Sequence, residues 1–236
     1  MQRIGLIGGM SWESTALYYR LANQLVAERL GGLHSADVVM RSIDFAVMEQ
    51  LQSRGEWAEA GTMLAEVAVE LEGAGAELLV LCTNTMHKVA ATIEAAVDIP
   101  LVHVVDATAQ AVRAAGTTSV GLLGTAFTME DHFYRDRLIS HGIDVIVPET
   151  DDRRVVHRVI YDELCRGILS ESSRQQFQAI MGRLVDSGAA GIVLGCTEIE
   201  LLVKQEDTDV PVFPTTRIHV SAAVDAALAD VSATGR

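Results

Sequence analysis

The feature that most limits what this chain can fold into is an internal repeat. Residues 75–83 (GAELLVLCT) align without a gap to residues 188–196 (GAAGIVLGC), and the apolar positions of the preceding stretches follow the same alignment. The start of the chain also has a counterpart, because residues 4–9 (IGLIGG) resemble residues 120–125 (VGLLGT). A segment that recurs in this way indicates one structural unit used twice along the chain.

Within each copy, short runs of apolar and β-branched residues alternate with longer amphipathic stretches. The runs predict strands at residues 4–7, 38–42, 78–82, 101–104, 119–123, 144–147, 191–194 and 212–213. The clearest helix lies at residues 12–30, with leucines on one side and Ser11 as its N-cap. This order is typical of the α/β class, and it predicts two pseudo-symmetric domains, each a parallel sheet covered by helices on both faces. We place the first domain at residues 1–100 plus 211–236 and the second at residues 101–210.

Charge and composition exclude several classes of function. The formal net charge is −14 and no basic run is present, which argues against nucleic-acid binding because phosphates need clustered Lys and Arg. No apolar run approaches the ~20 residues of a membrane helix, and the N-terminus enters the first strand without a signal peptide, so we expect a cytoplasmic protein. The odd number of cysteines favours free thiols, and no Cys or His spacing predicts a metal site.

Parallel α/β sheets place ligands beyond the C-terminal ends of their strands. Three of the predicted strand ends carry small polar residues, at 82–85 (CTNT), 124–128 (GTAFT) and 195–198 (GCTE). Backbone N–H groups at such strand-to-helix turns suit a carboxylate. We therefore expect one small anionic molecule to bind at the interface of the two domains. The thiol of Cys196 stands just before a predicted helix, whose dipole is expected to lower the thiol pKa towards the thiolate form.

Three segments carry a resemblance to a known family. Residues 5–11 (GLIGGMS), 81–87 (LCTNTMH) and 195–198 (GCTE) resemble the signature segments of the aspartate/glutamate racemase superfamily, in the right order and at the right separations. The similarity runs along nearly the whole chain and points to the branch of bacterial aspartate racemases and broad-specificity amino-acid racemases. It implies racemisation of a small amino-acid substrate by two bases, without pyridoxal phosphate or another cofactor. It also implies a homodimer.

The resemblance assigns the two bases to the ends of the repeated strands. Family members typically read Cys-Asn-Thr in the first half, whereas here Thr83 directly precedes Asn84-Thr85. The repeat leads to the same pair, because Thr83 and not Cys82 aligns with Cys196. Side chains alternate along a strand, so Cys82 should point away from the site unless a bulge turns it back. We predict an asymmetric enzyme: Cys196 as thiolate removes the α-proton of one enantiomer, the L form by the resemblance, and Thr83, alone or through a water, returns a proton on the opposite face.

Hydrogen-bond donors near the same strand ends are expected to hold the α-carboxylate and to stabilise the carbanion. The candidate substrate-binding residues are Met10, Asn84, Thr85, Thr125, Thr128 and Thr197. Strict aspartate racemases of the family hold the distal carboxylate with basic side chains, one of them a Lys shortly after an Ile-Tyr pair. Residues 160–165 (IYDELC) contain no Lys, so a broader or neutral range of substrates stays open beside aspartate.

Two other interpretations also stay open. A single cysteine suffices for some members of the superfamily, so the chain could instead decarboxylate malonates, isomerise maleate or racemise hydantoins through Cys196. Alternatively, a relative without the first cysteine could bind an amino acid and leave it unchanged. Carbon dioxide release, exchange of the α-proton, or ligand binding without exchange distinguishes these cases. His87 and Glu198 lie close in sequence to the two proposed bases, and each fits either a structural or an assisting role.

Overall fold

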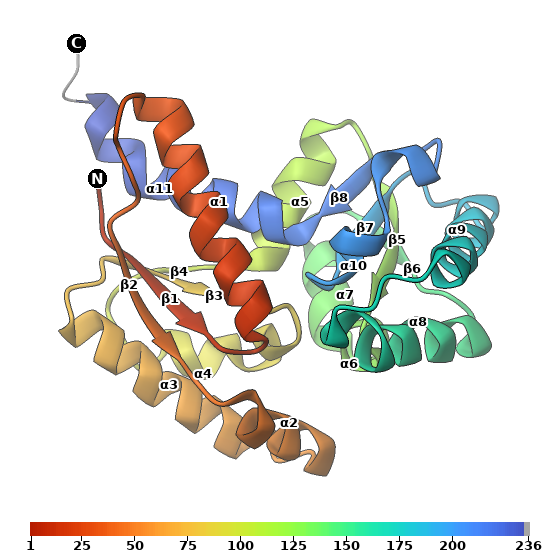
Figure 1. Cartoon of the computed structure of the whole chain (residues 1–236), viewed down its shortest axis with the longest axis horizontal. Helices are drawn as coiled ribbons and strands as arrows, with labels where there is room; N and C mark the ends of the chain where they lie inside the picture. Colours follow the sequence, from red (N-terminus) through yellow and green to blue (C-terminus); the bar gives the residue numbers. More distant parts are fainter. Residues whose placement is uncertain (234–236) are drawn as a thin grey trace. The chain divides into compact units, whose positions relative to one another are not determined.

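The computed structural model describes residues 1–233, and its backbone forms two sheets of four parallel strands (Figure 1). The chain divides into two compact units, each built around one of these sheets. Unit 1 consists of Met1–His103 and the segment that begins at His219, and unit 2 is Val104–Ile218. The chain therefore leaves unit 1 after His103 and returns to it at His219.

The sheet of unit 1 has the strand order β2-β1-β3-β4. Its strands are β1 (Ile4–Gly8), β2 (Val38–Ser42), β3 (Leu78–Leu81) and β4 (Leu101–Val102). Around it lie the helices α1 (Trp12–Leu30), α2 (Phe45–Arg54), α3 (Trp57–Gly73) and α4 (Ala90–Glu94), the 3-10 turn η1 (Thr85–Val89), and most of α11 (Thr215–Ala233). Helix α1 begins where the sequence predicts, because the Ser11 hydroxyl accepts a hydrogen bond from the Ser14 N–H.

The side chains of β3 show why helices cover both faces of this sheet. Leu79 and Leu81 point into a cluster formed with α2, α3 and η1, whereas Leu78 and Val80 point into a second cluster formed with α1 and α11. All four side chains are buried. Burial of each one contributes about 1.5–3 kcal/mol relative to an exposed side chain. A strand buried on both faces is continuously apolar rather than alternating, which is the pattern seen at residues 78–81.

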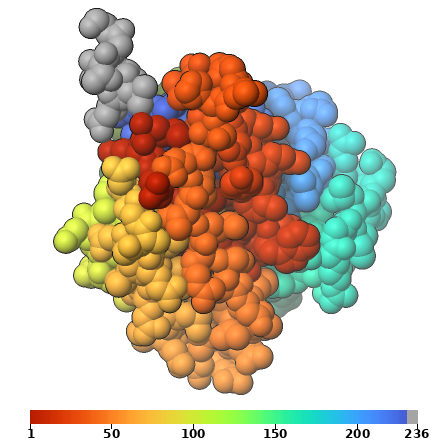
Figure 2. All heavy atoms as spheres, turned by 60° about the vertical axis from the view of Figure 1, so that its left-hand side comes forward, coloured from red at the N-terminus to blue at the C-terminus, as the bar shows by residue number. Residues whose placement is uncertain are grey.

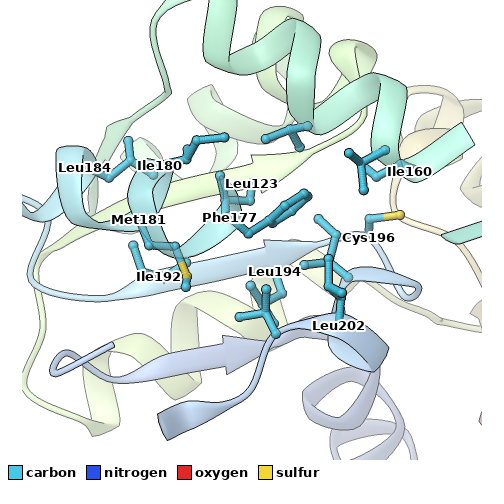
Figure 3. Close-up of a cluster of buried hydrophobic side chains, with 14 of the residues drawn as sticks. Leu123, Ile160, Phe177, Ile180, Met181, Leu184, Ile192, Leu194, Cys196 and Leu202 are labelled. Carbon is cyan, nitrogen blue, oxygen red and sulfur yellow. The ribbon is translucent and has the colours of Figure 1, made fainter. Parts of the chain in front are cut away.

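Unit 2 repeats this arrangement with the strand order β6-β5-β7-β8. Its strands are β5 (Ser119–Gly124), β6 (Asp144–Ile146), β7 (Ile192–Gly195) and β8 (Val212–Pro214). Its helices are α5 (Val104–Ala114), α6 (Ala126–Glu130), α7 (His132–Ser140), α8 (Thr150–Asp162), α9 (Glu171–Asp186) and α10 (Ile199–Leu202), with the 3-10 turns η2 (Leu164–Arg166) and η3 (Gln205–Asp207). The buried clusters place α8, α9 and α10 on one face of the sheet and α5 and α7 on the other. Figure 3 shows the first of these clusters, in which Phe177 lies against Leu123 and Leu194.

The two sheets correspond in register as well as in strand order. Gly5 of β1 pairs with Leu79 of β3, and Gly121 of β5 pairs with Ile192 of β7. These pairs are the ones that the internal repeat aligns with each other. A Cβ atom on Gly5 would lie 2.8 Å from the Leu79 side chain, so close packing requires glycine there. The predicted α/β class with a duplicated parallel sheet is confirmed.

All eight predicted strands are present, and the helix at 12–30 has the predicted bounds. Differences occur at strand ends. β4 ends at Val102 because α5 already begins at Val104. β4 pairs with β3 and therefore belongs to unit 1, and β8 pairs with β7 and therefore belongs to unit 2. The chain thus crosses to unit 2 after β4 and returns to unit 1 after β8. The domain bounds expected from the sequence, 100/101 and 210/211, place each crossing before the strand.

None of the helices within residues 1–233 combines the length and the hydropathy that a bilayer crossing requires. Strand β2 forms one edge of the sheet in unit 1, and its last three residues, Met40 to Ser42, are exposed. This edge lies within the orange surface of Figure 2. Arg41 forms an ion pair with Glu70 of α3 (3.1 Å), and a charged side chain on an edge strand discourages pairing with another chain.

Candidate active site

The first group of predicted site residues, Thr83–Thr85, forms the loop after β3, which we call the Thr83 loop. The Cys82 N–H still donates to the carbonyl of a β1 residue, whereas the Thr83 N–H donates to Leu81 O (2.8 Å) and turns the chain out of the strand. All three loop residues are buried, and Thr83 retains 9 % exposure. His87 of η1 donates its Nδ1–H to the Thr83 carbonyl (2.8 Å), and this hydrogen bond fixes the backbone of the loop at Thr83.

Cys82 belongs to the hydrophobic core and not to the Thr83 loop. Its side chain has no accessible surface and lies in the cluster that β3 shares with α1 and α11, beside Val80. Burial raises the pKa of the Cys82 thiol. The alternation of side chains along β3 accounts for this orientation. The thiol is therefore available neither as a base nor to solvent.

Two buried residues of unit 1 pack close to the η1 turn. Met10 lies in the same cluster as Met86 and is almost inaccessible. Gln52 of α2 donates its Nε2–H to the Met86 sulfur (3.0 Å), and its Oε1 has no hydrogen-bond partner among residues 1–233. A buried amide oxygen without a partner costs roughly 1–3 kcal/mol, so Gln52 is a place where a ligand donor would be stabilising. Sequence reasoning missed it, although a polar residue beside the buried Leu51 is a signal.

In unit 2, the end of β5 carries Thr125 and Thr128. The Thr125 hydroxyl accepts from the Thr128 N–H (3.3 Å) and caps the short helix α6. Thr128 has no accessible surface, because its side chain fills the space beside Gly124 and Gly195. The Ala126 N–H donates to Nδ1 of His157 on α8 (3.1 Å), a contact that the sequence did not indicate.

Cys196 directly follows β7. Figure 3 shows it at one end of the cluster, with its sulfur turned away from Phe177 and Leu194. It is 8 % exposed, and its Sγ–H donates to Oε2 of Glu198 (3.1 Å). Thr197, between them in sequence, is also buried. The end of β7 thus holds a thiol and a carboxylate in direct contact.

The resting state of Cys196 corrects the expectation of a preformed thiolate. Burial raises the pKa of the thiol well above its usual value, and the charge and hydrogen bond of Glu198 raise it further. The helix that follows, α10, has only four residues, so its dipole does not offset these effects. A helix dipole could be anticipated from sequence, whereas the depth of burial could not.

A second acidic residue lies on α10. The Glu200 carboxylate accepts a hydrogen bond from the Thr216 N–H at the start of α11 (2.9 Å). Burial raises the pKa of Glu200 to about 7. This carboxyl therefore changes its charge close to neutral pH.

The predicted site residues fall into two groups, one in each unit. Unit 1 contains Thr83 with Met10, Asn84 and Thr85, and unit 2 contains Cys196 with Thr125, Thr128 and Thr197. Because strand order and register repeat, Thr83 and Cys196 occupy corresponding positions after the third strand of each sheet. Within residues 1–233, no three His, Cys, Asp or Glu side chains are grouped so as to hold a metal ion.

These features define a class: a duplicated α/β protein with a buried polar turn at the same strand end of each half, which carries a hydroxyl in unit 1 and a thiol in unit 2. The family model for Asp/Glu/hydantoin racemases matches residues 7–223. The chain belongs to the Asp/Glu/hydantoin racemase family.

Known proteins agree with this assignment. The chain is 55 % identical to a Yersinia pestis protein proposed to be an Asp/Glu racemase, over 97 % of this chain and 100 % of the other, with a TM-score of 0.92. It is 33 % identical to an aspartate racemase homologue from Pyrococcus horikoshii, over 96 % and 99 % of the two chains, with a TM-score of 0.85. It is also 24 % identical over 165 residues to the broad specificity amino-acid racemase RacX of Bacillus subtilis, and this alignment covers 69 % of this chain and 70 % of that protein.

Proposed function

We propose that this protein is an amino-acid racemase without pyridoxal phosphate, in which Cys196 and Thr83 act on opposite faces of the substrate α-carbon. The observation that carries the proposal is the hydrogen bond from the Cys196 thiol to Glu198, at the strand end that the repeat matches with Thr83. The relatives named as racemases support the reaction class. Racemisation needs acid–base groups on both faces of one carbon, and a duplicated fold supplies corresponding positions for them.

The proposed reaction begins at the thiol–carboxylate pair. Glu198 accepts the Cys196 proton, so the thiolate forms while the pair keeps a single negative charge. The thiolate then removes the α-proton: the Cα–H bond breaks, the proton moves to Sγ, and the electron pair stays on the α-carbon. A buried thiolate is costly by itself, and the neighbouring proton acceptor lowers that cost because no charge is added to the pocket.

Thr83 serves the opposite face. Its hydroxyl, directly or through a water that it orients, donates a proton to the carbanion. The Thr83 alkoxide, or the hydroxide left by the water, regains a proton from solvent, and Glu198 releases its proton to solvent, which restores the starting state. A threonine hydroxyl is a far weaker acid than a thiol, so Thr83 cannot be a resting base. The proposed enzyme is therefore kinetically asymmetric, with faster proton removal from the enantiomer that faces Cys196, which we take to be the L form.

The carbanion needs donors aimed at the substrate carboxylate. We assign this binding role to the residues around the two bases: Asn84, Thr85, Thr125 and Thr197, with Met10 covering the substrate. The buried amide of Gln52 adds an acceptor suited to the substrate ammonium group. Thr128 acts by supporting Thr125, since its own side chain is fully packed. The family relation also leads us to propose a homodimer, which light scattering would measure.

The test is proton NMR in heavy water with a panel of L- and D-amino acids, aspartate and glutamate included. We expect the α-proton signal to disappear, with no change in the mass of the substrate except the replacement of hydrogen by deuterium. The exchange should be faster for L than for D substrates. Equal rates from both enantiomers would refute the assigned asymmetry. Exchange from no amino acid, together with ligand-induced thermal stabilisation, would instead identify a binding protein. Carbon dioxide release from malonates would identify a decarboxylase.

Three variants separate the roles. Cys196→Ala should abolish exchange from every substrate. Thr83→Ala should retain wash-in of deuterium into the L enantiomer and lose its conversion to the D form. Cys82→Ala is the matched control, because it removes a thiol that the mechanism does not use, and it should retain both activities. Loss of exchange in Cys82→Ala at unchanged stability would contradict the assignment of the base to Cys196.

A further inference from the structure

Unit 1 contains a buried group of three histidines and a tyrosine behind the Thr83 loop, which we call the histidine cluster: His87, His103, His219 and Tyr18. Each of the four side chains is at most 5 % exposed. The ring of His87 lies 4.5 Å from that of His103 and 5.6 Å from that of His219, centroid to centroid. Tyr18 of α1 contacts the far side of the group, with its hydroxyl 3.0 Å from Nδ1 of His219.

The hydrogen bonds determine which ring nitrogens carry protons. Val102 O lies 2.6 Å from Nε2 of His219, and a carbonyl oxygen only accepts, so Nε2 carries the proton. Nδ1 of His219 then accepts from the Tyr18 hydroxyl. By the same reasoning, His87 carries its proton on Nδ1, which donates to the Thr83 carbonyl. Burial lowers the pKa of His219 to about 4, so its ring is neutral at neutral pH.

The cluster lies where the chain enters and leaves unit 1. His103 is the last residue before the chain crosses to unit 2, and His219 is the first residue after it returns. Within unit 1, the cluster therefore connects both crossing points, the helix α1 and the Thr83 loop. His87 is its contact with the loop.

The internal repeat provides a comparison for His87. The repeat aligns His87 with Glu200, since each lies four residues after the proposed catalytic residue of its unit. Glu200 bonds to the Thr216 N–H and not to its own loop. Of these two side chains, only His87 forms a hydrogen bond with the backbone carbonyl of the proposed catalytic residue in its own unit, Thr83. The contact is thus specific to the unit that uses a hydroxyl in place of a thiol.

We propose that His87 is a positioning residue for Thr83, and that its packing against His103 and His219 fixes the loop for proton return on the Thr83 face. This inference rests on the proposed racemase function. A hydroxyl must be aimed within about 0.5 Å to donate a proton efficiently, and the orientation of Thr83 Oγ follows that of its own backbone. Loosening the carbonyl contact slows the step at Thr83 and leaves the step at Cys196 unchanged.

The experiment compares two rates on one sample of the full-length enzyme in heavy water. Wash-in of deuterium into the L enantiomer reports the Cys196 face, and appearance of the D enantiomer reports the Thr83 face. His87→Leu removes the donor to the Thr83 carbonyl, and His87→Asn keeps an N–H at the same place. We expect His87→Leu to lower conversion relative to wash-in by tenfold or more, and His87→Asn to restore most of that ratio.

His219→Phe tests the packing of the cluster and should lower the same ratio by a smaller factor, since it does not touch Thr83. Leu64→Ala, in the other cluster of unit 1, is the control for lost stability and should lower both rates in parallel. A parallel fall of both rates in His87→Leu, or no gain in His87→Asn, would overturn the inference.

A readout without turnover separates this inference from the proposed function. If the wild-type enzyme exchanged no substrate, the racemase proposal would fail on its own. Nitrogen-15 NMR of histidine-labelled protein would still report the His87 ring. We expect the tautomer with the proton on Nδ1 in the wild type and a changed Nδ1 signal in His219→Phe. A proton on Nε2, or a His87 signal unaffected by His219→Phe, refutes the positioning contact.

Discussion

Lowering the pH from 7 to 5 should destabilise unit 1 through His219. Burial lowers the pKa of this histidine from 6.5 to about 4, so the unfolded chain binds a proton in this range that the folded chain does not. Stability is therefore lost as pH falls below the unfolded pKa. The full difference of pKa corresponds to about 3 kcal/mol, of which about 2 kcal/mol is lost between pH 7 and pH 5.

The assay is urea unfolding followed by tryptophan fluorescence across this pH range. Both tryptophans, Trp12 and Trp57, lie in unit 1, so the signal follows the unit that contains His219. The matched variant is His219→Gln, which keeps an N–H for Val102 O and does not titrate. The wild type should lose about 2 kcal/mol more than the variant between pH 7 and pH 5. Parallel stability curves for the two proteins would refute the reasoning.

Four further variants probe the charges and the packing of the site. Glu198→Gln should lower the pKa of Cys196, because it removes the carboxylate charge and the charged acceptor; faster alkylation of Cys196 by iodoacetamide at pH 7.5, read by peptide mass spectrometry, is the expected result. Glu200→Gln should raise the melting temperature at pH 8 and not at pH 4: burial raises the pKa of Glu200 from 4.5 to about 7, so the wild type loses stability as pH rises through that value. Phe177→Ala should cost about 3–5 kcal/mol in the free energy of unfolding, and a loss below about 1 kcal/mol would contradict its place at the centre of the cluster in Figure 3. Gly9→Ala should lower the melting temperature, because Gly9 has φ +98° and a side chain there would collide with the backbone after β2; an unchanged midpoint would show that the turn can relax.

The periodic and repeated parts of the fold could be predicted because they depend on local pattern. The strand at 38–42 and the helix at 12–30 have their predicted bounds, and Ser11 caps that helix. The repeat also aligned Thr83 with Cys196, and the strand register agrees with it. Strand ends were less certain from pattern alone, because they depend on where the next helix begins.

The chemistry of the site depended on contacts between distant residues. Tyr18 and His219 are 201 positions apart in the chain, and no local pattern indicates that one donates to the other. The buried amide of Gln52 and the contact of His157 with the loop after β5 have the same origin.

Cys196 shows most clearly which properties the sequence determines and which only the tertiary structure determines. Its position after a buried strand followed from the order of residues, because hydrophobic periodicity and a duplicated pattern specify which segments become strands and where they end. Its protonation state did not, because a pKa depends on the water that packing removes and on the charge that folding brings near. The chain order places a thiol two residues before a carboxylate, and only the folded core decides that the thiol keeps its proton.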